Sequence, residues 1–180
     1  SGGIAASGGT LSNLNALIAA RHNAGLGSDP NSVLLVSEDA HSSFIKCTRI
    51  MGLDESNLVR IKTDNNGCMD IQNLRKIIDK CFIDNKKIFA IVATLGTTVR
   101  GAIDPIKEIS EICKERNIWL HIDGSIGGIF AVTSIPIKGL NNINQANSIT
   151  INPQKIIGIT KTSSLLLVSN MSTLENTFNT

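Results

Sequence analysis

The chain has 180 residues, of which 42% are hydrophobic and 18% are charged, and its formal net charge is +2. This composition is that of an ordinary globular domain with a hydrophobic core, and it excludes a disordered or collagen-like chain. The charge balance gives no reason to expect a nucleic acid or a membrane surface as partner, and no apolar run is long enough to span a bilayer.

The four cysteines, Cys47, Cys68, Cys81 and Cys113, match no zinc-binding or redox spacing. This pattern favours reduced thiols in a cytoplasmic protein. The N-terminus lacks the basic stretch and the apolar run of a signal peptide. The sequence opens in a Gly-rich stretch with no element before it and stops without a closing helix, so we expect a piece of a longer polypeptide.

Helices and strands are predicted to alternate along the chain. A helical pattern of apolar residues follows residues 8–10 and ends near residues 23–25. Further helices are predicted over residues 41–51, 70–82 and 104–116. Asp70 is the expected N-cap of one, and Pro105 the first helical residue of another. Apolar runs predict strands at residues 33–36, 58–61, 88–94, 118–122, 148–151 and 165–168. Residues 139–147 are rich in Asn and are interpreted as a loop.

This alternation indicates an α/β fold with a mostly parallel sheet flanked by helices. In such sheets, ligands bind at the carboxyl ends of the strands. Loops that carry polar or ionisable side chains follow four of the predicted strands, at residues 37–41, 95–98, 123–125 and 152–155. We therefore expect these loops to form the functional site.

The glycine-rich loop at residues 7–10 precedes the first predicted helix. Small residues let the backbone approach an anion, and the N–H groups at a helix start point toward it, so Gly9 and Thr10 are candidates for a phosphate site. The alternative is a plain helix cap with flexible glycines, which this short motif taken alone favours slightly. The loop is not a P-loop, because no Gly-Lys-Ser/Thr follows at the required spacing.

Asp123 follows directly after an apolar strand that also contains His121. A carboxylate at a strand end can pair with a buried cation. The protonated nitrogen of a pyridine ring is one such cation, and the ring becomes a stronger electron sink when it keeps this proton. The alternatives for Asp123 are a helix cap, a metal ligand or a plain Asp-Gly turn. We interpret His121 as structural.

Lys155 and His41 complete the set of candidate side chains. Lys155 lies just beyond a strand, where partial desolvation would make its amine nucleophilic toward an aldehyde, although an arbitrary lysine usually lies on the surface. Lys161 is the competing lysine and ranks lower because it falls later, among Thr and Ser residues. His41 could lie flat against an aromatic cofactor and shuttle protons, or it could cap a helix. His22, at the end of the first helix, is assigned to the capping role.

Five motifs in order give the sequence a resemblance to a known family. They are Ser7-Gly8-Gly9-Thr10 with Asn13 and Ala20-Arg21; Ala40-His41-Ser42-Ser43; residues 93–98 with 101–105; Trp119-Leu120-His121-Ile122-Asp123; and residues 147–150 with Asn152-Pro153-Gln154-Lys155. On these residues the chain resembles the group II pyridoxal-phosphate-dependent decarboxylases, relatives of glutamate, aromatic-amino-acid and diaminobutyrate decarboxylases. Each motif is weak by itself, but their order and spacing hold over nearly the whole chain.

The resemblance implies that residues 1–180 are part of the large, cofactor-binding domain of a fold type I enzyme, without its N-terminal segment and its C-terminal small domain. It also implies a homodimer that uses pyridoxal 5′-phosphate to decarboxylate an L-amino acid to an amine and carbon dioxide. Lys155 would hold the cofactor as a Schiff base, Asp123 would pair with the pyridine nitrogen, and His41 would stack on the ring. The implied further contacts are Ser125 on the other ring face, Gly9, Thr10 and Asn152 at the phosphate, and Thr98, with Thr97 next to it, at the ring.

Two positions depart from the family pattern. Gln154 stands where the family commonly has His, although an amide can still donate to a phosphate. Ser125 stands where the family usually has Ala and sets a hydroxyl against the ring face. In addition, the family protonates its intermediate with a tyrosine from a mobile loop later in the sequence, and this chain contains no Tyr. We therefore expect the 180-residue chain to bind cofactor at best and to turn over poorly.

Two kinds of alternative stay open. One is another enzyme of the same fold type, such as an aminotransferase, a carbon–carbon lyase or a cysteine desulfurase, and the other is a non-catalytic relative that acts as an interaction module. The joint presence of Asp123, His41 and Lys155 argues against an inert relative. A plain nucleotide-binding domain is disfavoured because the dinucleotide and P-loop fingerprints are absent. The isoleucines at positions 156, 157 and 159 could line a substrate pocket, but we expect them in the buried core.

Overall fold

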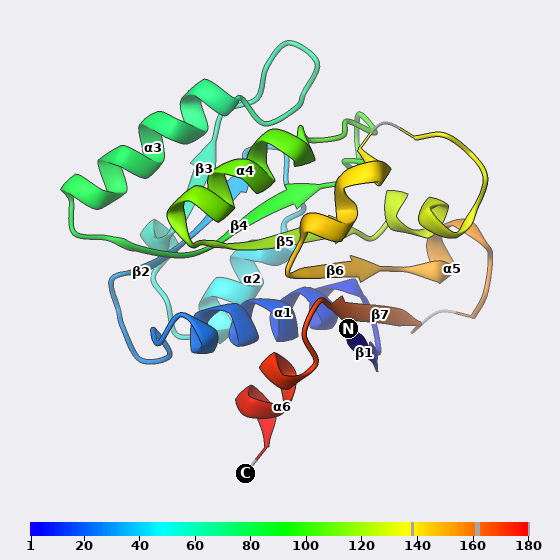
Figure 1. The fold of residues 1–180 in the computed structure, drawn as a ribbon, viewed down its shortest axis with the longest axis horizontal. Helices are drawn as coiled ribbons and strands as arrows, with labels where there is room; N and C mark the ends of the chain where they lie inside the picture. Colours follow the sequence, from blue (N-terminus) through cyan, green and yellow to red (C-terminus); the bar gives the residue numbers. More distant parts are fainter. Residues whose placement is uncertain (138, 161–162, 180) are drawn as a thin grey trace.

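The computed structural model describes residues 1–137, 139–160 and 163–179. A seven-stranded sheet forms its centre, with the strand order β1-β7-β6-β5-β4-β2-β3 (Figure 1). The strands are β1 (Gly2–Ala6), β2 (Ser32–Ser37), β3 (Leu58–Ile61), β4 (Lys87–Thr94), β5 (Trp119–Gly124), β6 (Ser148–Ile151) and β7 (Ser164–Val168). The α-helices are α1 (Gly9–Asn23), α2 (Ser43–Ile50), α3 (Ile71–Ile83), α4 (Ile106–Arg116), α5 (Pro153–Ile156) and α6 (Ser172–Phe178). Short 3₁₀ helices are η1 (Glu55–Asn57), η2 (Gly127–Val132) and η3 (Leu140–Gln145).

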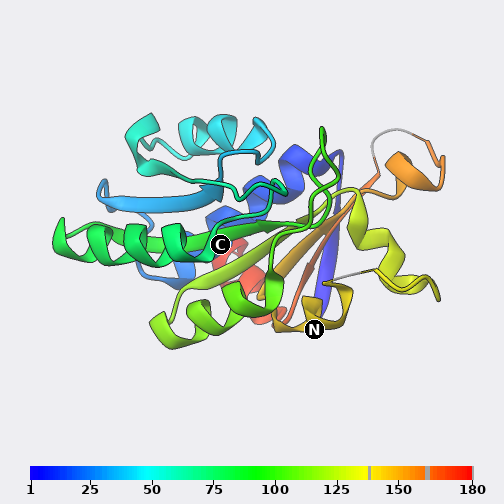
Figure 2. The ribbon, with the colours of Figure 1, turned by 90° about the horizontal axis from the view of Figure 1, so that it is seen from above.

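Helices cover both faces of the sheet. Side chains along a strand alternate between its two faces, so a strand that is apolar throughout presents apolar side chains on both faces. Val33 and Leu35 of β2 belong to one hydrophobic cluster with residues of α3 and α4. Leu34 and Val36 point the other way and belong to a second cluster with α1 and α2. Figures 1 and 2 show these two helix pairs on opposite sides of the sheet. Strands buried on both faces must be apolar throughout, which is why their continuous apolar runs predict them well.

The direction of the strands confirms the predicted α/β fold with a mostly parallel sheet. The pairs β2–β3, β2–β4, β4–β5 and β5–β6 are parallel, whereas β7 runs antiparallel to both β6 and β1. The parallel register places Thr94 of β4 opposite Asp123 of β5, and Asp123 opposite Thr150 of β6. The ends of three central strands are therefore aligned at one edge of the sheet, where the predicted site lies.

Most predicted elements are present, with boundaries shifted by one or two residues. Asp70 caps α3 as expected, and its carboxylate accepts two backbone N–H bonds from the first turn. Pro105 is the N-cap residue of α4, so its expected place as the first helical residue is off by one. The helix expected from residue 41 begins at Ser43. The loop expected over residues 139–147 contains the 3₁₀ helix η3.

Two elements at the ends of the chain differ from the expectation. Strand β1 is made of Gly, Ile and Ala, which gives it little intrinsic strand propensity, and its pairing with β7 along its whole length decides its structure. Helix α6 packs through Leu174 in a third hydrophobic cluster with α1 and β7. The expectation of an end without a closing helix is therefore wrong. Over the described ranges, no helix combines the length and the hydropathy that crossing a membrane requires.

Candidate active site

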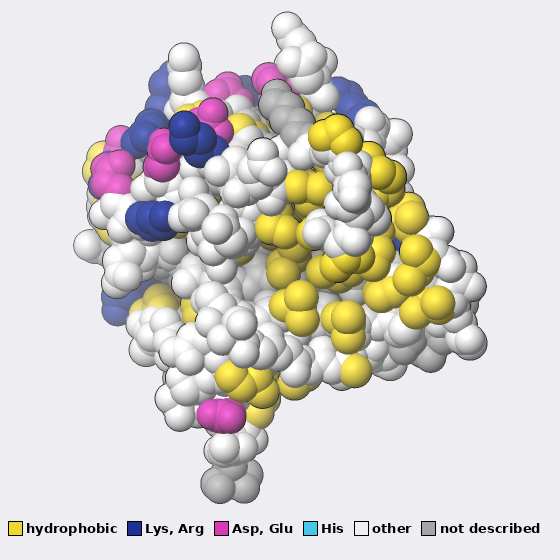
Figure 3. All heavy atoms as spheres, turned by 45° about the vertical axis from the view of Figure 1, so that its right-hand side comes forward, with side chains coloured by type: hydrophobic (Ala, Val, Ile, Leu, Met, Phe, Trp, Pro, Cys, Tyr) yellow, Lys and Arg dark blue, Asp and Glu magenta, His cyan; other side chains and the backbone are white. Residues whose placement is uncertain are grey.

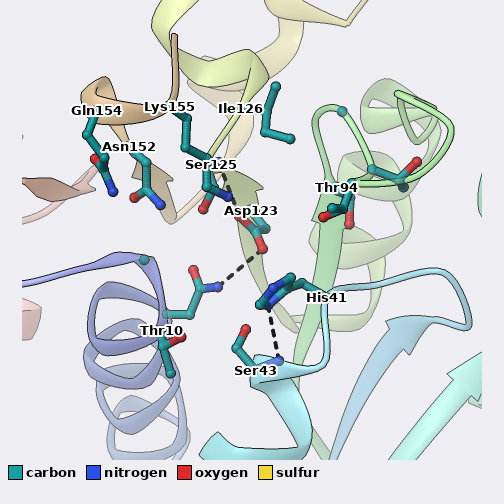
Figure 4. Close-up of a pocket in the computed structure, with 15 residues that line it drawn as sticks. Thr10, His41, Ser43, Thr94, Asp123, Ser125, Ile126, Asn152, Gln154 and Lys155 are labelled. Carbon is teal, nitrogen blue, oxygen red and sulfur yellow. Dashed lines mark hydrogen bonds between the residues drawn. The ribbon is translucent and has the colours of Figure 1, made fainter. Parts of the chain in front are cut away.

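A cavity of about 250 Å³ opens at the carboxyl edge of the sheet. It lies between the N-terminus of α1, the loops that follow β2, β4 and β5, and the short helix α5 (Figure 4). All nine residues that the sequence indicates for the site line this cavity: Gly9, Thr10, His41, Thr98, Asp123, Ser125, Asn152, Gln154 and Lys155. The fold thus brings together side chains from both ends of the sequence, as the convergence of the four loops predicts.

Asp123 lies in the buried wall of the cavity, at the end of β5. Its Oδ2 accepts a hydrogen bond from Asn13 Nδ2 at 3.2 Å, and its Oδ1 accepts one from the backbone N–H of Ser125 at 3.1 Å. Two donors on different oxygens fix the rotation of the carboxylate. In the described part of the chain, no group of three or more His, Cys, Asp or Glu side chains is placed to hold a metal ion.

His41 stands at the mouth of the cavity, in the turn between β2 and α2. Its Nδ1 accepts a hydrogen bond from the backbone N–H of Ser43 at 3.1 Å. In the neutral ring the proton then lies on Nε2, which is free to donate to a group in the cavity. Figure 4 shows the ring between Ser43 and Asp123, where a flat ligand in contact with Asp123 would meet it.

Gly9, at the start of α1, lies close to the side chains of Asn152 and Ser125 in the cavity. A Cβ at this position would lie 2.5 Å from Asn152 Nδ2 and 3.0 Å from Ser125 Oγ, so the site requires glycine. Asn152 Oδ1 accepts a hydrogen bond from Ser164 Oγ at 2.5 Å, which turns its Nδ2 toward Gly9. The first N–H groups of a helix lack intrahelical partners and favour anions. These donors together form a cradle suited to a phosphate group.

Lys155 lies on the opposite rim, on the one-turn helix α5 (Figure 4). The residue is exposed, so the expected partial desolvation is absent from this chain. The expected core role of the following isoleucines is also wrong, because Ile156, Ile157 and Ile159 are 44%, 57% and 45% exposed. Helix α5 projects beyond the sheet, and none of the described residues covers this rim. The competing Lys161 lies outside the described residues.

Gln154 and Thr98 lie on the same exposed side of the cavity as Lys155. Gln154 is half-buried, and its Oε1 accepts a long hydrogen bond from Ser163 Oγ at 3.5 Å. This contact leaves the Gln154 amide NH₂ available as a donor toward the cavity. Thr98 is exposed in the loop after β4, next to the buried Thr97, whose hydroxyl accepts a hydrogen bond from the backbone N–H of Ala102. Thr97 thus braces this loop, and Thr98 faces the opening.

The structure adds two buried hydroxyl groups to which the sequence analysis gives no role. Ser43 Oγ and Thr94 Oγ1 line the cavity, are shielded from solvent and have no hydrogen-bond partner among the described residues. An unsatisfied buried hydroxyl costs free energy, and a polar ligand in the cavity would relieve this cost. Both residues lie in the motifs that carry the family resemblance. A motif does not reveal, however, that a hydroxyl lacks a partner.

Asp104 braces the wall of the cavity from behind and was expected only to start a helix. Its carboxylate is 1% exposed and accepts hydrogen bonds from the backbone N–H groups of Met69 and Thr94, both at 2.7 Å. Burial raises the pKa of Asp104 to about 6, although these two hydrogen bonds act in the opposite direction. Asp104 thereby ties the loop before α3 to the end of β4, where Thr94 lines the cavity.

The whole chain, residues 1–180, matches the family model described as the pyridoxal-dependent decarboxylase conserved domain. The chain belongs to this family. The acidic amino acid decarboxylase GADL1 of Xenopus tropicalis is 35% identical over 162 residues, which are 86% of this chain and 32% of that protein. The aromatic-L-amino-acid decarboxylase of Bacillus atrophaeus is 32% identical over 177 residues, which are 98% of this chain and 37% of that protein.

Solved structures of pyridoxal-dependent decarboxylases share the fold of this chain. The tryptophan decarboxylase of Catharanthus roseus, in complex with L-tryptophan, superposes with a TM-score of 0.91 at 28% identity, over 99% of this chain and 39% of that one. This likeness confirms the resemblance stated from the sequence. The chain spans 32–37% of the length of the two curated relatives described above.

Proposed function

We propose that the protein is a pyridoxal-phosphate-dependent decarboxylase that converts an L-amino acid into an amine and carbon dioxide. The observation that carries this proposal is the convergence of Asp123, His41 and Lys155 on one cavity, in a chain of the decarboxylase family. An aminotransferase or a carbon–carbon lyase of the same fold type would share the carboxylate and the lysine, so family membership is what favours decarboxylation.

The polar groups that line the cavity offer a partner for the phosphate, for the ring nitrogen and for the aldehyde of the cofactor. Gly9, Thr10 and Asn152 would hold the phosphate, since they offer N–H groups and an amide at a helix N-terminus. Asp123 would face the ring nitrogen, and Lys155 would reach the aldehyde from the rim. The unpartnered hydroxyls of Ser43 and Thr94 would gain partners from polar groups of the cofactor or the substrate.

Each residue would have a defined task in the reaction. When bound, pyridoxal phosphate supplies an electron sink for the charge left by the departing carboxylate. Asp123 would hold the proton on the pyridine nitrogen. His41 would cover one face of the ring and present its Nε2–H to the cavity, while Ser125 would lie against the other face. Gln154, in the place of the family's usual His, would donate its amide NH₂ to the bound ligand.

We also propose that residues 1–180 are part of the large cofactor domain of a cytoplasmic homodimer. The exposed hydrophobic residues around the Lys155 rim support this arrangement. Figure 3 shows hydrophobic side chains gathered on the face where η2, α5 and the segment after α5 lie. The large exposed hydrophobic residues of η2 and the segment after it, and of α5 and the segment after it, are Val132, Ile135, Ile156, Ile157 and Ile159. A surface of this kind favours burial against further protein. We expect the 180-residue chain alone to turn over poorly.

The test is incubation with pyridoxal phosphate, borohydride reduction and peptide mapping, with circular dichroism to verify folding. A reduced pyridoxyl group on Lys155 is expected, and it should be lost in Lys155→Ala and retained in the control Lys161→Ala. A folded protein that is labelled at Lys161 instead would refute the assignment of Lys155, and a folded protein labelled at neither lysine would favour the interaction module. Product analysis on a longer polypeptide then separates the enzyme classes, because a keto acid in place of an amine and carbon dioxide would indicate an aminotransferase.

The substrate screen should include both acidic and aromatic L-amino acids. The two curated relatives described above are an acidic amino acid decarboxylase and an aromatic-L-amino-acid decarboxylase, and their identities to this chain are 35% and 32%. Similar identities to two substrate classes give neither class an advantage. Release of carbon dioxide from one class and not from the other assigns the side-chain specificity.

A further inference from the structure

A line of buried polar side chains leads from the interior of the sheet to Asp123, and we call it the buried hydrogen-bond chain. Trp119 Nε1 donates to Ser148 Oγ at 2.8 Å, and Ser148 Oγ lies 2.8 Å from His121 Nδ1. His121 Nε2 lies 3.0 Å from Asn13 Oδ1, and Asn13 Nδ2 donates to Asp123 Oδ2 at 3.2 Å. None of these five residues is more than 7% exposed.

The chemistry of the two end groups is consistent with one direction of the buried hydrogen-bond chain. The indole N–H of Trp119 can only donate, so Ser148 Oγ accepts from it and has its own proton available to donate to His121 Nδ1. At the other end the carboxylate of Asp123 accepts, so Asn13 turns its NH₂ toward Asp123 and its oxygen toward His121. The Asp123 end therefore requires the His121 proton to lie on Nε2, and the Trp119 end is compatible with this position.

Burial keeps the His121 ring neutral, and in this form one ring nitrogen donates a hydrogen bond while the other accepts one. Desolvation of the fully buried ring lowers the pKa of His121 to about 4, although the neighbouring Asp123 acts in the opposite direction. The ring is therefore neutral at pH 7. A neutral imidazole has one donor and one acceptor, which matches its two contacts.

Asn13 also links the two ends of the cavity. It lies on α1, three and four residues after Thr10 and Gly9, and residues at this spacing share one face of a helix. The helix that carries the candidate phosphate cradle therefore also holds the carboxylate at the other end of the cavity. Each oxygen of Asp123 accepts one protein donor and keeps a lone pair for a ligand.

We propose that the buried hydrogen-bond chain, from Trp119 to Asn13, positions the Asp123 carboxylate to bind a protonated ring nitrogen. The proposal rests on the proposed function, because that function assigns the ring nitrogen to Asp123. The other four members of the buried hydrogen-bond chain are positioning residues that act through Asp123. They are Trp119, Ser148, His121 and Asn13. A purely structural role would require only that their polar atoms are satisfied, in either direction.

The first test reads the His121 tautomer by ¹⁵N NMR in histidine-labelled protein without cofactor. The chain has three histidines, so separate His22→Gln and His41→Gln variants assign the signals. The expected result is the Nε2–H tautomer at pH 7. In Trp119→Phe, which removes the donor at the far end, a fraction of the Nδ1–H tautomer should appear. An Nδ1–H tautomer in the wild type would overturn the direction of the buried hydrogen-bond chain.

The second test compares the pyridoxal phosphate affinities of two asparagine variants. Asn13→Ala should weaken binding about 10–100-fold, because it removes a hydrogen bond to a charged group. The matched control is Asn57→Ala, since Asn57 is also buried and its amide donates to the carbonyls of Pro30 and Ser32, both at 2.8 Å. Asn57 does not line the cavity, so its variant should lose stability and keep its affinity.

The outcomes separate this inference from the proposed function. A wild type that binds cofactor while Asn13→Ala binds as tightly as Asn57→Ala refutes the positioning role alone. A folded wild type that binds no pyridoxal phosphate refutes the proposed function, whatever the tautomer of His121. If Asn13→Ala does not fold, Trp119→Phe provides the comparison, and an unchanged tautomer with unchanged affinity in that variant overturns the proposal.

Discussion

The buried wall and the rim of the cavity are built in opposite ways. Asp123, Asn13 and Asn152 in the wall are buried, and other side chains of the same chain fix their orientation. His41 and Lys155 on the rim are exposed. The groups that must keep one orientation are thus fixed within the chain, whereas the lysine is held by a single helical turn. Since the chain spans about a third of its curated relatives, we expect other segments to complete the rim.

The largest effect is expected from removal of the brace behind the wall. Asp104→Ala leaves two buried backbone N–H groups, of Met69 and Thr94, without an acceptor. It should lower the free energy of unfolding by about 4 kcal/mol at pH 7, because each unsatisfied buried donor costs about 1–3 kcal/mol. Urea unfolding followed by circular dichroism measures this loss.

The control for this variant is an aspartate on the surface. Asp54 also accepts a backbone N–H bond, from Ser56 at 2.8 Å, but it is exposed. Asp54→Ala should cost much less than Asp104→Ala, because water can replace the lost acceptor at this exposed cap. Equal losses in the two variants would show that burial of the brace contributes nothing.

Acid should act on the wall through two buried groups with opposite effects on stability. The pKa of His121 is lowered to about 4, so the unfolded chain binds the proton first and stability falls as the pH drops below 6.5. The pKa of Asp104 is raised to about 6, so the folded chain binds the proton first and stability rises over the same range. Between pH 6.5 and 4.5 each contribution is on the order of 2 kcal/mol, and the two act in opposite directions.

Two variants should separate these opposing contributions. His121→Gln retains only the Asp104 effect and should gain stability, relative to the wild type, as the pH falls from 6.5 to 4.5. Asp104→Asn retains only the His121 effect and should lose stability, relative to the wild type, over the same pH range. Urea unfolding at several pH values measures both slopes, and a comparison with the wild type removes the contribution of the other carboxylates. Parallel slopes in the two variants would contradict the opposite pKa shifts.

The contrast between wall and rim also explains what the sequence could predict. The central strands β2 and β4 are buried on both faces and form continuous apolar runs, so the sequence predicts them to within one residue of their observed boundaries. The sequence indicates Asp123 and Lys155 as candidates because each follows a predicted strand at the ligand-binding edge of the sheet. Ser43, Thr94 and Asp104 were given no role in the site because it depends on packing between segments far apart in the sequence. No local pattern records a missing partner, or a carboxylate shared by two loops.

A smaller effect on stability is expected from a substitution at Gly9, which lies against Asn152 in the wall of the cavity. In Gly9→Ala the new Cβ would press on Asn152 Nδ2, so the helix start or the asparagine must shift. We expect a loss of about 1–2 kcal/mol in stability and about 10-fold weaker binding of pyridoxal phosphate, since overpacking displaces the phosphate donors. The control is Gly8→Ala, because a Cβ at Gly8 would meet nothing within 4 Å. Equal affinities in the two variants would remove Gly9 from the phosphate site.

The smallest effect is expected on the rim, at Ile157. Ile157→Ser removes most of an apolar side chain, but the residue is 57% exposed, so the free energy of unfolding should change by less than about 0.5 kcal/mol. Ile122→Val in the hydrophobic core removes only one carbon from a fully buried side chain and should cost about 1 kcal/mol. Urea unfolding of the 180-residue chain tests this order. In a longer polypeptide that completes the rim, Ile157→Ser should become the more costly change, because the side chain would then be buried against protein. An unchanged order in that polypeptide would show that the rim is a solvent-facing surface and not an interface.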